Sequence, residues 1–373
     1  MLQYITSGES HGQYLIALLK GMPSGLRLDS DAVNEQLARR QKGYGRGPRM
    51  HIETDMIHIT SGVYRKKTTG APIGLMIKNR EVNIQNLPQL FRPRPGHADL
   101  AGALKYDQGI REVLERSSAR ETALRVAVGT VARQLLGEFS ITLLAHVVRI
   151  GSVEAGKNAR ASFDEIAAKT AGSRLNCVSP AAEKKMITEI EKAVKKGDTL
   201  GGKFEVLASG VPLGLGSHTD YDRKLDGKIA QAFMSLQAVK AVEIGMGTGC
   251  AEQPGSRVHD EIFYSKEKGY YHATNNAGGI EGGISNGSEI RVTATMKPIA
   301  TLKRSLRSVD MKTKRAQTAS FERSDVCAVS ACSVIGEAVL AYVLADAFLE
   351  KFGGDSMKEI KRNYKGYIKQ IRK

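Results

Sequence analysis

Hydrophobic and polar positions follow two different periods along this chain, and each period predicts one kind of element. Stretches that alternate every second residue, or that are briefly apolar throughout, end at glycine or polar residues and predict β-strands. These stretches are residues 1–6, 73–78, 141–151, 199–208 and 290–298, with further strands or hairpins expected within 52–74. The apolar run 14–19 fits a strand or a helix equally well.

A three- to four-residue period predicts helices over 29–40, 121–138, 228–239 and 326–348. Before the second of these, Ser118 and Glu121 match the Ser-x-x-Glu capping box. Asp325 stands at the start of the last, where a carboxylate commonly caps a helix. The segment 157–196 is polar and helical, so we expect it at the periphery of a single domain that spans 1–373.

Composition narrows the class of protein. The chain has 373 residues, 41% of them hydrophobic and 25% charged, which is typical of a soluble globular protein. Its formal charge of +16 favours an anionic partner: a polyanion, an anionic membrane surface, or small multiply charged substrates. The scattered cysteines show no zinc-like pairing, so we expect reduced thiols and no metal site. They are Cys177, Cys250, Cys327 and Cys332.

Nothing at the start of the chain matches a secretory leader. The longest apolar stretch, 326–336, lies between Asp325 and Glu337 and is too short to span a bilayer. A soluble protein in the cytoplasm that does not bind membranes is therefore the expectation.

The strongest candidate site lies within 92–123. Arg92 and Arg94 each precede a proline, which favours an extended, stiff arm that leads to His97. Such an arm needs little ordering to surround an anionic group. The following RSSARE run places hydroxyls and two arginines at a predicted helix start, an arrangement that suits a phosphate. A solvated turn and an ordinary capped helix are the alternative interpretations.

Three other loops carry polar or flexible residues in similar density. His11 lies in a loop bounded by glycines, where backbone can approach a ligand closely. The loop 39–49 is basic, but with Tyr44 as its one aromatic residue it is a poor match for a single-strand RNA groove. The glycine-rich loop 278–287 matches neither a P-loop nor a dinucleotide fingerprint. An ordered loop against which a flat ligand could lie is the favoured interpretation.

Seven motifs, in this order along the chain, together resemble the signatures of the chorismate synthase family. They are GESHG (8–12), RRQKGYGRG (39–47), RPGHAD (94–99), RSSARETA (116–123), NNAGGIEGGISNG (275–287), KPIAT (297–301) and RSD (323–325). The resemblance spans nearly the whole chain. It implies an α+β fold, a β-α-β sandwich with a helical layer between antiparallel sheets, assembled as a homotetramer.

The resemblance also implies a reaction, a carbon–oxygen lyase step of the shikimate pathway in aromatic amino acid biosynthesis. Phosphate leaves 5-enolpyruvylshikimate 3-phosphate by an anti-1,4 elimination that gives chorismate. The reaction requires reduced FMN (FMNH2) but has no net redox change. A phosphorylated substrate that also carries two carboxylates accounts for the basic charge without nucleic acid. No added domain indicates an internal flavin reductase, so an external one is expected, with NADPH as a candidate reductant.

Residue roles follow from the resemblance motif by motif. It implies catalytic roles for His11, His97 and Asp325, and substrate or NADPH binding by Arg40 and Arg46, with Arg49 in the same loop. The implied flavin contacts are Arg116, Ser117, Ser118, Gln237, Ala238, Gly282, Lys297, Pro298, Ile299, Ala300, Thr301 and Arg323. Gln237 departs from the asparagine of some relatives, which keeps the amide but lengthens the side chain.

The sequence does not assign individual proton-transfer steps to these groups. Either histidine could protonate the departing phosphate while the other protonates reduced flavin. Asp325 is expected to help move a proton at flavin N5, with Arg323 holding its carboxylate ionised. Two other classes remain as alternatives: a basic RNA-binding protein, and a flavin oxidoreductase with net NADPH turnover.

Overall fold

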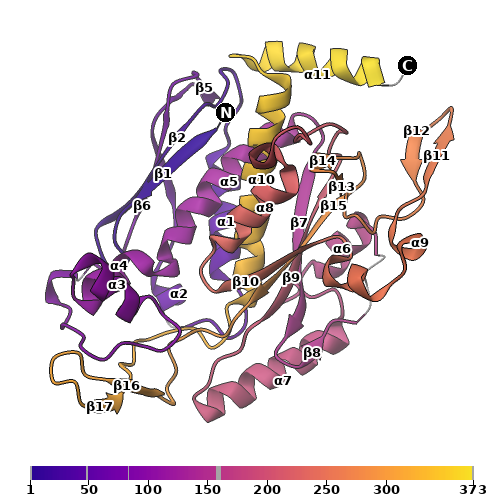
Figure 1. Ribbon diagram of the computed structural model, residues 1–373. Helices are drawn as coiled ribbons and strands as arrows, with labels where there is room; N and C mark the ends of the chain where they lie inside the picture. The colour runs from indigo at the N-terminus through magenta and orange to yellow at the C-terminus, as the bar shows by residue number, and fades with distance from the viewer. Residues whose placement is uncertain (1, 48, 83, 157–160, 372–373) are drawn as a thin grey trace.

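Two antiparallel sheets contain the longer strands of the computed structural model, which describes residues 2–47, 49–82, 84–156 and 161–371 (Figure 1). The first sheet has the order β1(Gln3–Ser7), β2(Tyr14–Lys20), β6(Ile73–Lys78), β3(Ile57–Ser61). The second has the order β10(Val239–Ile244), β15(Ile290–Met296), β9(Gly202–Ser209), β7(Thr142–Ile150), β8(Val153–Glu154).

A layer of helices lies between the two sheets (Figure 1). It comprises α1(Ser30–Gln41), α5(Thr122–Gly137), α8(Leu225–Met234) and α10(Val329–Phe352). Helix α5 contacts β2 and β6 of the first sheet, and α10 contacts β7 and β9 of the second. The fold is therefore an α+β sandwich of two sheets around a helical layer, as the family resemblance implied.

Strand β2 shows why the first sheet has one face in the core. Its pattern of alternate burial places Leu15 and Leu19 in the core and leaves Ile16 and Leu18 on the outer face, 47% and 42% exposed. Leu18 pairs with Ile5 on β1, which is 71% exposed on the same face. The ambiguous run 14–19 is thus a strand, and the outer face of this sheet carries apolar side chains that no described residue covers.

Helix α10 fills the centre of the molecule. It is the one helix among the described residues that is long and apolar enough to cross a membrane, but 89% of its most apolar window is buried inside the protein. Gly129 of α5 allows a close helix crossing, since a Cβ there would stand 2.2 Å from the Ala338 carbonyl oxygen. α10 is therefore a core helix.

Helices α6(Phe163–Thr170) and α7(Pro180–Lys196) pack against the second sheet, where they contact β7 and, for α7, β8. Ile166 and Ile190 on these helices are fully buried in the main hydrophobic core. The first residues of the segment predicted to be peripheral, 157–160, lie outside the described part of the chain.

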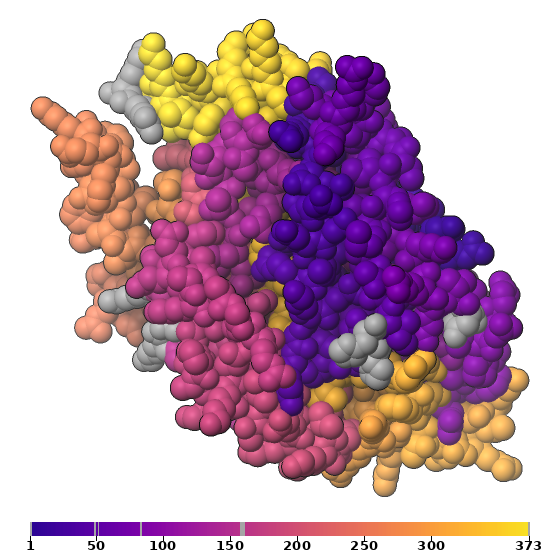
Figure 2. Space-filling model, turned by 180° about the vertical axis from the view of Figure 1, so that it is seen from behind, coloured from indigo at the N-terminus to yellow at the C-terminus, as the bar shows by residue number. Residues whose placement is uncertain are grey.

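Short elements complete the chain. The other helices are α2(Arg49–Ile52), α3(Asp99–Tyr106), α4(Ile110–Ser117), α9(Gly255–Val258) and α11(Met357–Ile371), with 3-10 turns η1(Ile84–Asn86), η2(Ala119–Glu121), η3(Tyr221–Arg223) and η4(Gly247–Glu252). The small hairpins are β4(Val63–Tyr64)–β5(Lys67–Thr68), β11(Ile262–Ser265)–β12(Gly269–His272), β13(Ile280–Glu281)–β14(Ile284–Ser285) and β16(Arg307–Val309)–β17(Ala316–Thr318). The β11–β12 hairpin projects from the body in both views (Figures 1 and 2).

One predicted helix start and one predicted capping box are wrong. Helix α10 begins at Val329 rather than 326, because the Val326 and Cys327 amides donate to the Gly45 carbonyl, at 2.9 and 3.2 Å. The capping box is absent: Ser118 accepts from the Arg120 amide at 3.3 Å and starts η2. The Glu121 carboxylate instead bonds Arg125, at 3.0 Å.

The predicted helix 228–239 also ends differently. Helix α8 stops at Met234, and β10 begins at Val239 after a positive φ of 68° at Ala238. A left-handed residue interrupts a helix, so the chain can turn here and send Gln237 and Ala238 toward a different neighbour.

Candidate active site

Loops from distant parts of the chain enclose a cavity of about 640 Å³. Most of the predicted site residues line it. They are His11, Arg40, Arg46, His97, Ser117, Ser118, Gln237, Ala238, Lys297, Pro298, Ile299, Ala300, Thr301, Arg323 and Asp325. The sandwich thus brings six of the seven motifs to one place.

The lining of the cavity is strongly cationic. The arginines and lysine among the described lining residues are Arg40, Arg46, Arg94, Arg120, Lys297 and Arg323. Against these stand three carboxylates, Glu81, Glu322 and Asp325. Walls with an excess of one charge attract and concentrate oppositely charged ligands, so the cavity suits a multiply charged anion.

A buried carboxylate holds two of these arginines in place. Asp55 contacts Arg120 Nη1 at 2.7 Å and Arg40 Nη1 at 3.4 Å, and all three residues are at most 4% exposed. Burial, opposed by Asp55 and reinforced by Arg120, lowers the pKa of Arg40 to about 10. Arg40 therefore stays charged at neutral pH. A second buried carboxylate, Glu53, lies 3.7 Å from Arg120 Nη2, so the pair of arginines is fixed by two acids behind the cavity wall.

Each predicted catalytic histidine is held by a carboxylate at Nδ1. His11 Nδ1 lies 2.8 Å from Glu115 Oε1, and its backbone N–H donates to Glu115 Oε2 at 2.8 Å. His97 Nδ1 lies 2.5 Å from Asp99 Oδ1. Nδ1 of each ring thus faces a carboxylate, and proton transfer to a ligand would use Nε2, which on His97 lies 3.5 Å from Arg94 Nη2.

Both supporting carboxylates are ionised. Burial alone would raise the pKa of Asp99, but hydrogen bonds from Arg94 and His97 outweigh it and hold the pKa well below its ordinary value. Burial also acts to raise the pKa of Glu115, and the hydrogen bonds from His11 reverse that effect and lower it. The two histidines are therefore oriented by permanent negative charges.

Asp325 does not act as a helix cap. Its Oδ1 accepts the Gly47 N–H at 2.6 Å, and its Oδ2 forms an ion pair with Arg46 Nε at 3.0 Å. The partner predicted for it, Arg323, pairs instead with Glu81, at 2.7 Å. Asp325 thus faces the cavity, linked to the basic loop 39–47 rather than to α10.

The cavity also offers polar atoms that have no protein partner. Ser117 Oγ and Gln237 Oε1 are buried and lack a hydrogen bond among the described residues. Leu114 and Met296 add apolar surface to the same walls. A flat phosphorylated cofactor such as a flavin nucleotide requires unpaired polar atoms, cations and apolar walls. The residues of this cavity supply all three, so they fit a flavin nucleotide.

Two predicted flavin-binding residues do not line the cavity. Arg116 is exposed and donates to the carbonyls of Thr6 and Gly8, at 2.9 and 3.4 Å. Gly282 and Gly283 form the two-residue turn of the β13–β14 hairpin, with φ of 58° and 84°, and such turns require positive φ. The Arg49 side chain lies outside the described part of the structure.

Several groups in and behind the cavity were not among the predicted site residues. Asp99 and Glu115 hold the histidines, Asp55 holds two arginines, and Ser10 lines the wall. Asp99 had a sequence signal, since it follows His97 by two residues. Asp55 had none, because only the folded chain brings it to Arg40 and Arg120.

A β-α-β sandwich whose loops form one cationic cavity with two carboxylate-held histidines defines an enzyme for small phosphorylated substrates. Comparison with known proteins identifies the family to which this enzyme belongs. The family model for chorismate synthase matches residues 2–349. The chain belongs to the chorismate synthase family, whose members are carbon–oxygen lyases.

Individual relatives agree with this assignment over their full length. The chain is 52% identical to the chorismate synthase of Desulforamulus reducens and 53% identical to that of Geotalea daltonii, covering 100% of both proteins in each case. A solved crystal structure of chorismate synthase superposes with a TM-score of 0.84 at 43% identity, covering 100% of this chain and 98% of the other.

Proposed function

We propose that this protein releases phosphate from 5-enolpyruvylshikimate 3-phosphate by anti-1,4 elimination and forms chorismate, with reduced FMN as cofactor and no net redox change. One observation carries the proposal: a single cavity unites six cationic side chains with two histidines held by ionised carboxylates. A substrate with one phosphate and two carboxylates needs such a cationic site, and its leaving phosphate needs a proton donor.

The arginines bind and stabilise anionic groups in this scheme. Arg40 and Arg120, fixed by Asp55, line the cavity wall and can donate charge-assisted hydrogen bonds from their Nη groups to a phosphate or carboxylate. Because they are held before the substrate arrives, they stabilise charge that develops on the leaving phosphate without rearrangement. Arg46, in the basic loop 39–47, forms an ion pair with Asp325, a carboxylate that also lines the cavity.

Proton transfer falls to the histidines and Asp325. Nε2 of His11 or of His97 donates to the departing phosphate oxygen, and Glu115 and Asp99 stabilise the charged ring before the proton leaves. Asp325 accepts and returns a proton on its carboxylate, which Arg46 and the Gly47 amide hold in place. Residues such as Ser117, Gln237 and Lys297 would hold reduced FMN, which would supply electron density that weakens the allylic C–O bond.

The test is an anaerobic assay of phosphate release from the shikimate ester. We expect release with reduced FMN, none with oxidised FMN or without flavin, and no net flavin oxidation per product formed. Stoichiometric oxidation of flavin or of NADPH would favour the oxidoreductase alternative. Saturable RNA binding that weakens steeply with salt, together with no phosphate release, would favour the nucleic-acid alternative.

We further propose a cytoplasmic homotetramer supplied with reduced flavin by a separate reductase, with NADPH as a reductant for the flavin rather than for the substrate. Four free cysteines are consistent with a reducing compartment. The apolar outer face of β1 and β2, with Ile5 71% exposed, favours association with another copy. Light scattering and a coupled NADPH–reductase assay test these two proposals.

A further inference from the structure

A group of exposed cations lies on the segment that connects two walls of the active-site cavity. Residues 297–301 and 322–325 line that cavity. Residues 302–321 between them form the β16–β17 hairpin and its connections, and none of them is a lining residue. Because both ends of this segment are cavity walls, the hairpin lies beside the cavity rather than within it.

The segment and the adjoining end of α7 carry a dense positive charge. The Arg304 amide donates to the Gly197 carbonyl at 2.9 Å, which joins the two elements. Residues 195–198 and 302–318 together contain eight cations and only two carboxylates. The eight cations, which we call the basic patch, are exposed and form no ion pair with a described carboxylate; they are Lys195, Lys196, Lys303, Arg304, Arg307, Lys312, Lys314 and Arg315.

The two carboxylates bond backbone amides instead of cations of the basic patch. Asp310 Oδ1 accepts the amides of Lys312 and Thr313, at 2.9 and 2.8 Å. Asp198 Oδ1 accepts the Thr199 amide at 2.8 Å. Most of the positive charge is therefore not neutralised by the protein. Like charges repel and destabilise a compact fold, so stability does not account for the basic patch.

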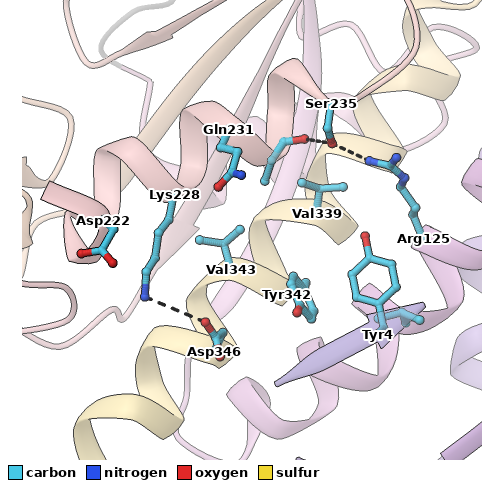
Figure 3. A pocket seen from close by; sticks show the side chains of 12 residues that line it. Tyr4, Arg125, Asp222, Lys228, Gln231, Ser235, Val339, Tyr342, Val343 and Asp346 are labelled. Atoms are coloured by element: carbon cyan, nitrogen blue, oxygen red, sulfur yellow. Dashed lines mark hydrogen bonds and ion pairs between the residues drawn. The ribbon is translucent and has the colours of Figure 1, made fainter. Parts of the chain in front are cut away.

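Cations in a second, smaller pocket are neutralised. This pocket, of about 370 Å³, lies between β1, α5, α8 and α10 (Figure 3). Its cations are paired, Arg125 with Glu121 at 3.0 Å and Lys228 with Glu350 at 2.7 Å. Its other charged lining residues are both acids, Asp222 and Asp346. This pocket therefore has no excess of positive charge, in contrast to the basic patch.

The hairpin is held in place by the arm 92–97. Ser308 Oγ donates to the Pro93 carbonyl at 2.6 Å, and the Met311 amide donates to the Phe91 carbonyl at 2.8 Å. The same arm carries cavity-lining residues. The basic patch thus has a defined position relative to the cavity.

The basic patch is also close enough for its electric field to reach the cavity. Arg304 follows the lining residue Thr301 by three positions, so their Cα atoms are at most about 11 Å apart. The screening length of salt is about 8 Å at physiological ionic strength and about 30 Å at 0.01 M. An approaching anion therefore feels the basic patch before it contacts the cavity walls.

We propose that the basic patch is an encounter surface for small multiply charged anions, which it attracts to the cavity and whose entry it accelerates. The identity of these anions rests on the proposed function: FMN and the substrate each carry a phosphate, which bears about two negative charges at pH 7. Once bound, the anion contacts the cavity walls, and the basic patch contributes little to its residence time. Exposed charges of this kind change association rates and their salt dependence more than dissociation rates.

The test is stopped-flow fluorescence of oxidised FMN binding to the full-length protein, at ionic strengths of about 0.01 M and about 0.15 M. The patch variant is Arg304→Gln, Arg307→Gln, Arg315→Gln. At the lower ionic strength, FMN should associate with it at least about threefold more slowly than with the parent, because three attractive charges are lost. Its dissociation rate should stay within about twofold, and the difference in association should shrink at the higher ionic strength.

The matched control removes three exposed charges from α11, which lies at the opposite end of the molecule from β16–β17 (Figure 1). It is Lys358→Gln, Lys365→Gln, Lys369→Gln, and FMN should associate with it within about 1.5-fold of the parent rate. Both variants change exposed side chains, so their melting temperatures should match that of the parent.

Three results would overturn the encounter surface. These are an unchanged association rate in the patch variant, an equal decrease in both variants, or a loss of affinity that comes from faster dissociation. The second result would assign the effect to net charge, and the third would make the basic patch part of the bound site. Failure of the parent itself to bind FMN would instead contradict the proposed cofactor, and would remove the anion on which the inference depends.

Discussion

At the scale of single residues, four carboxylates hold the cationic and histidine side chains that line the cavity. Asp325, Asp99, Glu115 and Asp55 each contact a cation or histidine that lines the cavity. The sequence, through its loop patterns and its family resemblance, singled out the histidines and most of the arginines that the structure brings to one cavity. It could not place their carboxylate partners, since Asp55 meets Arg40 and Arg120 only through tertiary packing.

For Asp325→Asn we expect turnover to fall at least about 10²-fold, the low end for a lost acid–base group. Asn keeps an oxygen for the Gly47 N–H, so the fold should be retained and melting lowered only modestly. Steady-state phosphate release separates two roles. A fall in kcat indicates proton transfer, whereas a rise in KM alone would mean that Asp325 acts only by positioning Arg46.

The lowered pKa of Asp99 predicts that the free energy of unfolding depends on pH. Its pKa in the folded protein is held far below the value of about 3.9 for an unfolded aspartate. Its ionised form therefore stabilises the fold above about pH 4, and this contribution is lost as the pH falls below that value. In Asp99→Asn, urea midpoints measured from pH 6 to pH 3 should decline less steeply than in the parent. Identical slopes would contradict the assignment.

At the scale of elements, strands were predicted more accurately than helix ends. Short apolar runs mark β6, β7 and β9, which are buried over successive residues, and a period of two residues marks β15, whose burial alternates. The start of α10 was predicted too early because tertiary hydrogen bonds compete there with helical ones: the Val326 amide donates to the Gly45 carbonyl. The turn after α8 was missed because it depends on a positive φ at Ala238, a non-glycine residue.

The crossing of α5 and α10 gives a prediction with a matched control. Gly129→Ala should destabilise the protein by about 1–3 kcal/mol, because its Cβ would collide with the Ala338 backbone and force the helices apart. Gly137→Ala, at the end of the same helix, meets nothing within 4 Å and should be neutral or stabilising by up to about 1 kcal/mol. Chemical denaturation measures both, and equal stabilities would refute the close crossing.

At the scale of the whole molecule, the layer order came from the family resemblance and not from periodicity. Hydrophobic periods identify which face of an element is buried, but not which other element covers it. Nothing in the pattern of β2 says that α5 covers its inner face. The apolar outer face had no sequence signal either, because the run 14–19 fits both strand and helix.

That outer face predicts the assembly state. Leu18→Asp should reduce the molar mass measured by light scattering, since a charge at the centre of an apolar interface is costly to bury. The isolated subunit should lose little stability, because Leu18 is already 42% exposed there. Val194→Asp, half exposed on α7, is the control and should leave the mass unchanged. An unchanged mass for both variants would exclude this face as the interface.

The central position of α10 has a consequence for how the molecule is synthesised. Residues 329–352 leave the ribosome after both sheets, yet they fill the space between them. Until they emerge, the inner face of the second sheet cannot be covered by its final neighbour, whereas α5 is already available to cover the first. Such late, long-range closure is intrinsically slow and leaves apolar surface exposed meanwhile. The nascent chain should therefore depend on chaperones until its last helices are released, and a chain stopped before residue 329 should aggregate rather than fold.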